Sequence, residues 1–342
     1  MAMTATTFTP LQQQLMTLSA LAATDETPIT GESPAQQAAR ILGDLNSENG
    51  LDQPGSATAG VWTATWVGVS SDSEHANVAF IAQNGTSGDY AVAIRGTDPK
   101  MKIDVAEDMD VGSPSQPFTA GGQTVQISQG ALQAHTAMIT AVGPDGTTTL
   151  LEALQAASPT TLSVTGHSLG GAMATTIGLY LMDTFGPSVN VTTFAAPTAG
   201  LDDFATLFAT QLGSSYQRFY NAWDVIPNAW ATLESIVVAD NWYPMPQTPG
   251  PTASADEQAS ITKDQEKTDG MPYAQPVPES GNEFVLNQGN SPLWGLGKLQ
   301  LKYFDEQLSF QHQCNTYLEL LGAPPVTVYD PHSPGSSAGE VM

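Results

Sequence analysis

The chain has 342 residues, of which 41% are hydrophobic, and its 34 acidic side chains outnumber the 9 basic ones to give a net charge of −25. The hydrophobic content is ordinary for a water-soluble globular protein, and the length allows one large core or two modest ones. The acidic excess argues against a nucleic-acid partner and against charge-driven binding to anionic membranes, because both require clustered basic side chains.

Cysteine usage and the first residues give some information on location. The single cysteine, Cys314, excludes an internal disulfide and is interpreted as a filler of the core rather than a second nucleophile. The first ten residues lack the basic and apolar regions of a Sec signal peptide. We therefore expect a protein without a transmembrane segment that is cytoplasmic, exported by another route, or a mature form whose leader has been removed.

The first hundred residues predict two amphipathic helices followed by three strands. The helices are expected over 10–23 and 34–45, and Ser33 is a candidate N-cap in front of Pro34. Asn-Gly and Ser-Gly pairs separate the second strand from the third, which indicates an antiparallel start of the sheet. These strands are expected over 61–69, 77–83 and 89–95.

From residue 129 onwards, helix-like and strand-like segments alternate. This pattern predicts the α/β fold class, with a mostly parallel central sheet covered by helices on both faces. The expected helices cover 129–142, 147–157, 168–184 and 202–212. The expected strands cover 160–165, 189–195 and 216–221.

The last hundred residues lose this regularity. Eight prolines between 240 and 292 predict an irregular insertion, because proline interrupts helices and sheets. An amphipathic helix is expected over 303–321. We interpret the chain as a single domain made of an N-terminal helical segment, a core in two pieces, the insertion and a loose tail, which cover 1–58, 60–238 with 293–321, 240–292 and 323–342, respectively.

The segment Gly166-His167-Ser168-Leu169-Gly170 matches the motif G-x-S-x-G between a strand-like and a helix-like stretch. Strand, sharp turn and helix form the context of a nucleophile elbow, in which a serine occupies a strained turn. A second match is centred on Ser337, but prolines precede it and no strand or helix pattern flanks it. Ser168 is therefore the predicted nucleophile.

A serine hydroxyl needs a base to take its proton, and the base needs an acid to orient it. In the chain order Ser, Asp, His, the candidates for the base are His312 and His332. His332 lies in the tail, whereas an apolar helical face follows His312, so His312 is the predicted base. Asp224 is the predicted acid because it comes just after a strong strand, where catalytic groups gather in parallel sheets; Asp240 is the alternative.

An oxyanion hole needs two backbone N–H donors in fixed positions. Leu169, directly after the nucleophile, is expected to supply one. Thr97 is expected to supply the other, because it follows the strand-like segment 89–95 and Gly96. The alternative is a plain turn built on Gly96.

Residues 99–111 combine an apolar helical face with acidic residues that lie largely elsewhere. The apolar face, Met101, Val105 and Met109, predicts either a lid over an acyl pocket that contacts a lipid interface transiently, or an ordinary surface helix. The acidic residues lack the pattern of a calcium-binding EF-hand loop. We expect no metal and no other cofactor.

Several of these segments, in this order and spacing, are similar to the class 3 (fungal-lipase-like) lipases over about 60–320: Ile94-Arg95-Gly96-Thr97, the Ser168 segment, Phe194-Ala195-Ala196-Pro197, Asp224-Val225-Ile226-Pro227, and His312 with Tyr317. The resemblance implies an α/β-hydrolase fold and hydrolysis of lipid or small carboxylic esters, most directly acylglycerols. Phospholipase A1 activity, a broader esterase that accepts aromatic-acid esters, and a secreted membrane-attacking effector are the alternatives.

Overall fold

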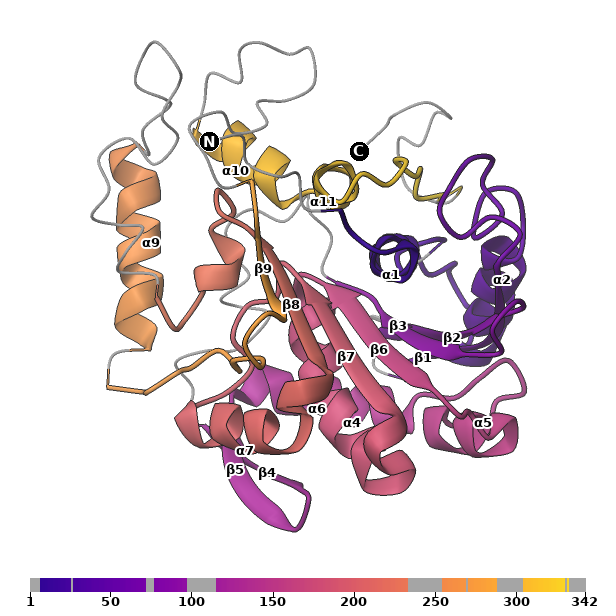
Figure 1. The fold of residues 1–342 in the computed structure, drawn as a ribbon, viewed down its shortest axis with the longest axis horizontal. Coiled ribbons are helices and arrows are strands. Elements are labelled where there is room, and N and C mark those ends of the chain that lie inside the picture. Colours follow the sequence, from indigo (N-terminus) through magenta and orange to yellow (C-terminus); the bar gives the residue numbers. More distant parts are fainter. Residues whose placement is uncertain are drawn as a thin grey trace.

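The central feature of the fold is a seven-stranded sheet with the order β1-β2-β3-β6-β7-β8-β9 (Figure 1). The computed structural model describes residues 7–25, 27–71, 77–96, 115–232, 254–268, 270–287, 304–329 and 331. The strands are β1 (Trp62–Val69), β2 (Val78–Asn84), β3 (Tyr90–Ile94), β6 (Leu162–His167), β7 (Val189–Phe194), β8 (Tyr216–Asn221) and β9 (Glu283–Leu286). The pairs among β1, β2 and β3 are antiparallel, and all later pairs are parallel.

Helices cover both faces of this sheet, which confirms the predicted fold class (Figure 1). On one face lie α4 (Gln129–Thr140), α5 (Leu150–Ala157), α6 (Leu169–Phe185) and α7 (Asp202–Leu212). On the other lie α1 (Pro10–Leu21), α2 (Pro34–Leu45) and α11 (Cys314–Leu320). None of the helices in the described ranges is long and apolar enough to cross a bilayer.

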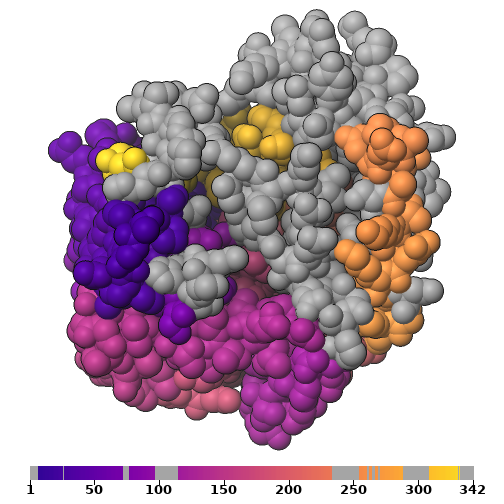
Figure 2. All heavy atoms as spheres, turned by 180° about the vertical axis from the view of Figure 1, so that it is seen from behind, coloured from indigo at the N-terminus to yellow at the C-terminus, as the bar shows by residue number. Residues whose placement is uncertain are grey.

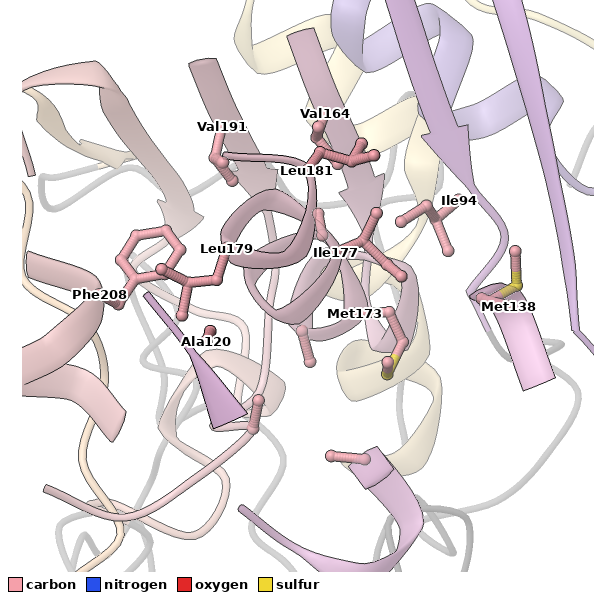
Figure 3. Close-up of a cluster of buried hydrophobic side chains, with 14 of the residues drawn as sticks. Ile94, Ala120, Met138, Val164, Met173, Ile177, Leu179, Leu181, Val191 and Phe208 are labelled. Carbon is pink, nitrogen blue, oxygen red and sulfur yellow. The ribbon is translucent and has the colours of Figure 1, made fainter. Parts of the chain in front are cut away.

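The two faces of the sheet bury separate apolar cores because successive side chains of a strand point to opposite sides. On the α6 face, Ile177 lies in one cluster with Ile94 and Val164 of the sheet (Figure 3). On the opposite face, Ala91 and Ala93 of β3 belong to the core beneath α1. The elbow between β6 and α6 is therefore anchored from both sides.

The start of α2 follows its predicted chemistry. Ser33 caps the helix, since its Oγ accepts the N–H of Gln36 at 3.3 Å, and the side chain of Gln36 accepts the N–H of Ser33 at 2.9 Å. Pro34 occupies the first turn, where the missing N–H has no helical partner to lose.

A hairpin that the sequence analysis did not predict precedes α4. It consists of β4 (Gln116–Ala120) and β5 (Gln123–Ile127), joined by a turn with two glycines at positive φ, Gly121 and Gly122. The hairpin projects at the lower edge of the molecule (Figures 1 and 2).

The prediction of an irregular insertion over 240–292 is wrong for the parts of it that the structure describes. This stretch contains α9 (Ala255–Lys267) and β9, which pairs with β8 as the seventh strand of the sheet. Its prolines lie between 244 and 251, between 272 and 278, and at 292, so both elements fall in proline-free intervals. The prediction relied on the number of prolines in the whole stretch and overlooked the two proline-free intervals that form α9 and β9.

Two other predictions for the last part of the chain need correction. The helix expected over 303–321 is two helices, α10 (Phe304–His312) and α11, because Gln313 adopts an extended conformation between them. The first residues of the expected loose tail are packed, since Ala323 and Val326 are buried. The amide of Asn315 holds Val326 through two hydrogen bonds of 3.0 Å.

His135 in α4 is a buried histidine with an unusual setting. Its ring packs edge-on against Phe118 and Tyr180, with centroid separations of 5.0 and 5.7 Å. Its Nδ1 has no hydrogen-bond partner in the part of the chain that the structure describes. Burial lowers the pKa of His135 from 6.5 to about 4.

This low pKa predicts a loss of stability on acidification. The unfolded chain binds a proton at this histidine below its ordinary pKa, whereas the folded chain does not until much lower pH, so stability falls as the pH drops through that interval. Between about pH 7.5 and about pH 5, the free energy of unfolding should fall by about 2 kcal/mol from this residue. Denaturant unfolding of the wild type and of His135→Leu at both pH values measures the effect, and equal pH slopes for the two proteins would contradict it.

Candidate active site

Ser168 occupies the sharp turn between β6 and α6, with φ 56° and ψ −130°. A non-glycine residue with positive φ is strained and persists where its surroundings enforce it. The atoms that enforce this conformation belong to the backbone of neighbouring segments. A Cβ on Gly166 would overlap the backbone of Gly170, and a Cβ on Gly170 would overlap the carbonyl oxygen of Ile94 at the end of β3. Three segments therefore meet at a distance that only glycine allows.

The structure brings Ser168, His312 and Asp224 into direct contact. The Nε2 atom of His312 lies 2.8 Å from Oγ of Ser168, and its Nδ1 lies 2.7 Å from Oδ2 of Asp224. The three residues are far apart in the chain, with 144 positions between Ser168 and His312 and 88 between Asp224 and His312. Each comes from the end of a regular element: the turn after β6, the loop after β8, and the last residue of α10.

The carboxylate of Asp224 is fully buried and has a partner for each oxygen. Oδ1 accepts the backbone N–H of Ile226 at 3.0 Å, and Oδ2 accepts the hydroxyl of Tyr317 at 2.8 Å in addition to its contact with His312. Since a carboxylate can only accept, Nδ1 of His312 carries the proton and Nε2 directs its lone pair at Ser168. This arrangement allows the imidazole to take the hydroxyl proton of Ser168.

His167 lies beside this chain of contacts without competing for the proton. Its ring packs 4.7 Å from the ring of His312 and 5.3 Å from that of Tyr317, measured between centroids. Burial, and next the proximity of His312, hold the pKa of His167 well below 6.5. His167 is therefore neutral at physiological pH, and its side chain contributes packing beneath His312.

Of the two predicted oxyanion-hole donors, the described residues include Leu169 but not Thr97. Leu169 is the first residue of α6, so its N–H has no acceptor within the helix and lies next to the serine. A Cβ on Gly96 would stand 2.6 Å from the carbonyl oxygen of His167 and 3.3 Å from Cβ of Ser168, so the chain after β3 passes directly over the elbow. Thr97, the next residue, lies outside the described residues. The predicted lid residues Met101, Val105 and Met109 and the less favoured candidates Asp240, His332 and Ser337 lie outside them as well.

Cys314, two residues after His312, fits the interpretation as part of the core. It is half-buried and packs against the apolar cluster beneath α1. Burial raises the pKa of its thiol to about 12, so the thiol remains protonated and poorly nucleophilic at neutral pH.

Sequence reasoning gave no polar role to two residues that complete the site. The hydroxyl of Tyr317 accepts the backbone N–H of Asn221 at 2.9 Å and donates to Asp224. The side chain of Asn221 contacts Gln311, the residue before His312. The resemblance to class 3 lipases includes Tyr317 beside His312 but gives its hydroxyl no role, and no motif marks Asn221; both residues lie within five positions of a predicted catalytic residue.

The close approach at the elbow generates a prediction. Gly166→Ala should reduce the free energy of unfolding by about 1–3 kcal/mol, because the added Cβ meets backbone that cannot move aside. The matched control is Gly213→Ala. Gly213 has φ −52° and no atom within 4 Å of an added Cβ, so this change should be neutral or stabilising by about 0.4–1 kcal/mol.

Denaturant unfolding of the two variants measures this difference. Comparable stabilities for Gly166→Ala and Gly213→Ala would show that the backbone contact at the elbow is not restrictive.

Residues 91–233 match the family model for "Lipase (class 3)". Among solved structures, the chain is similar to M37 lipase with a TM-score of 0.70 and 23% identity, and the match covers 91% of this chain and 92% of that one. This likeness establishes the α/β-hydrolase fold. No curated protein sequence matches the chain.

Two fungal structures are less similar. A Rhizomucor miehei lipase–propeptide complex gives a TM-score of 0.47 at 18% identity, with 64% of this chain and 62% of that chain covered. Lip2 lipase from Yarrowia lipolytica gives a TM-score of 0.47 at 17% identity, with coverages of 64% and 72%.

Proposed function

We propose that this chain is a lipase-type carboxylic-ester hydrolase of the class 3 lipase family, and that Ser168, His312 and Asp224 perform the hydrolysis on acylglycerols. The observation that supports the proposal is the continuous series of short contacts from Ser168 Oγ through the His312 ring to the Asp224 carboxylate. Hydroxyl, imidazole and carboxylate in this order form the arrangement that activates a serine.

In the proposed reaction, Nε2 of His312 takes the hydroxyl proton while Oγ of Ser168 attacks the ester carbonyl carbon. The carbonyl oxygen becomes an oxyanion that accepts the N–H of Leu169, and Thr97 supplies the second N–H. Asp224 stabilises the protonated imidazole. His312 then gives its proton to the departing alcohol, which leaves an acyl ester on Ser168.

Water completes the cycle by the same route. His312 takes a proton from water, the resulting hydroxide attacks the acyl carbon, and the bond to Ser168 breaks as Oγ regains a proton from His312. The products are a carboxylic acid and the free serine. The imidazole of His312 transfers protons in both acylation and deacylation, so a displacement of His312 should slow both steps.

The two G-x-S-x-G matches give a direct test of the nucleophile. Ser168→Ala should lower the kcat for a p-nitrophenyl ester by at least about 10³-fold, because the covalent route is lost. Ser337→Ala, the matched control, should leave kcat unchanged. Substantial activity in Ser168→Ala, or its loss in Ser337→Ala, would overturn the assignment.

The choice of acylglycerols is tested with a series of esters of increasing acyl length, measured in solution and as an emulsion. A lipase should prefer long chains and should be faster once the substrate forms an interface. A preference for short soluble esters, with no gain at the interface, would indicate an esterase. Release of fatty acid from phospholipid vesicles but not from triacylglycerol emulsions would indicate phospholipase A1 activity.

A further inference from the structure

Asn221, the last residue of β8, connects the segment that carries His312 with the segment that carries Asp224. Its side chain is 1% exposed. The Nδ2 atom donates two hydrogen bonds to Gln311, one to the backbone oxygen at 3.0 Å and one to Oε1 at 2.7 Å. Gln311 is itself fully buried and directly precedes His312. One amide group therefore fixes both the main chain and the side chain beside the imidazole.

The other polar atoms of Asn221 contact the turn that carries Asp224, and its Oδ1 also accepts a hydrogen bond from Nδ2 of Asn287 at 3.4 Å. The same Oδ1 accepts the N–H of Trp223 at 3.1 Å, which closes the turn that leads to the aspartate. The backbone N–H of Asn221 donates to the hydroxyl of Tyr317, and that hydroxyl donates to Oδ2 of Asp224. The backbone oxygen of Asn221 also accepts the N–H of Asp224 at 3.0 Å. Asn221 thus contacts Asp224 through its main chain and the residue before His312 through its side chain.

The fold explains why such a connection is needed. Ser168 follows β6 and Asp224 follows β8, and these two strands flank β7 in one sheet, so the strands fix the positions of both residues. His312 instead ends a nine-residue helix that is followed at once by a break at Gln313. No strand of the sheet leads directly into this residue, but two hydrogen bonds from Asn221 of β8 attach the preceding residue, Gln311, to the sheet.

An amide is the chemistry that this position requires. It presents two donors and one acceptor in a single plane, which matches the two oxygens of Gln311 on one side and the N–H of Trp223 on the other. A carboxylate would bring an acceptor against the oxygens of Gln311, and an aliphatic side chain of the same size would provide no hydrogen bond.

We propose that Asn221 is a positioning residue that holds His312 in line with Ser168 and Asp224, an inference that rests on the function proposed above. It touches neither the substrate nor the reacting atoms. Its loss should therefore lower kcat rather than raise KM, because the error in geometry affects the transition state more than substrate binding.

The test compares Asn221→Leu, Gln311→Leu and the double variant with Asn190→Leu. Asn190 is half-buried in β7 and its Nδ2 donates to the carbonyl oxygen of Ser188 at 3.2 Å, so it controls for replacing a sheet asparagine. The assays are kcat and KM for a p-nitrophenyl ester, thermal unfolding, and the rate at which a fluorophosphonate labels Ser168.

We expect Asn221→Leu to lower kcat and the labelling rate by about 10- to 100-fold with KM changed less than about 3-fold. Gln311→Leu, which keeps the backbone oxygen, should have a smaller effect of the same kind. The double variant should be little worse than Asn221→Leu, because the two side chains act as one unit. Asn190→Leu should retain the wild-type kcat.

A folded Asn221→Leu with a normal kcat and labelling rate would overturn the inference. If that variant does not fold, Gln311→Leu decides: a reduced kcat in a folded protein supports the inference, and an unchanged kcat overturns it. Ser168→Ala separates this outcome from failure of the proposed function. Activity that survives Ser168→Ala contradicts the nucleophile itself, whereas activity lost there and kept in Asn221→Leu contradicts only the role of Asn221.

Discussion

The close backbone contact at the elbow is the constraint on which the rest of the site depends. The turn after β6 can hold Ser168 at positive φ because the backbones of Gly166, Gly170 and the end of β3 approach within a distance that excludes a Cβ. That contact requires α6 to press against the sheet, and the small residues at the start of α6 permit it. The apolar core beneath α6 therefore stabilises a strained serine, and the site is a consequence of the packing.

The site also requires that the negatively charged carboxylate of Asp224 be stable in the protein interior. A buried carboxylate is costly unless each oxygen has a hydrogen-bond partner. Asp224 has three partners: a backbone N–H, the Tyr317 hydroxyl and the His312 ring. Two of the three come from the segment that contains α10 and α11. The same contacts that stabilise the carboxylate thus also attach this segment to the sheet.

Much of this architecture could be predicted from the sequence, because strong local patterns mark it. The elbow glycines, the alternating apolar segments and the aspartate after β8 each leave a signal within a few residues. The strand β9 does not, since it has four residues and depends on pairing with β8. The hydrogen bonds from Asn221 to Gln311 and to Tyr317 could not be predicted either. They join residues 90 or more positions apart, a distance over which a single sequence carries no pattern.

The order of the site residues along the chain has a consequence for synthesis in the cell. Ser168 and Asp224 are made first and can take their places on the sheet, but His312 arrives after β9 has extended that sheet. While the α10 segment is still inside the ribosome, the nascent chain contains Ser168 but lacks His312, the proposed base, at the site. Under the proposed mechanism such a chain is inert, so ester hydrolysis begins only after the α10 segment has been made and has joined the sheet.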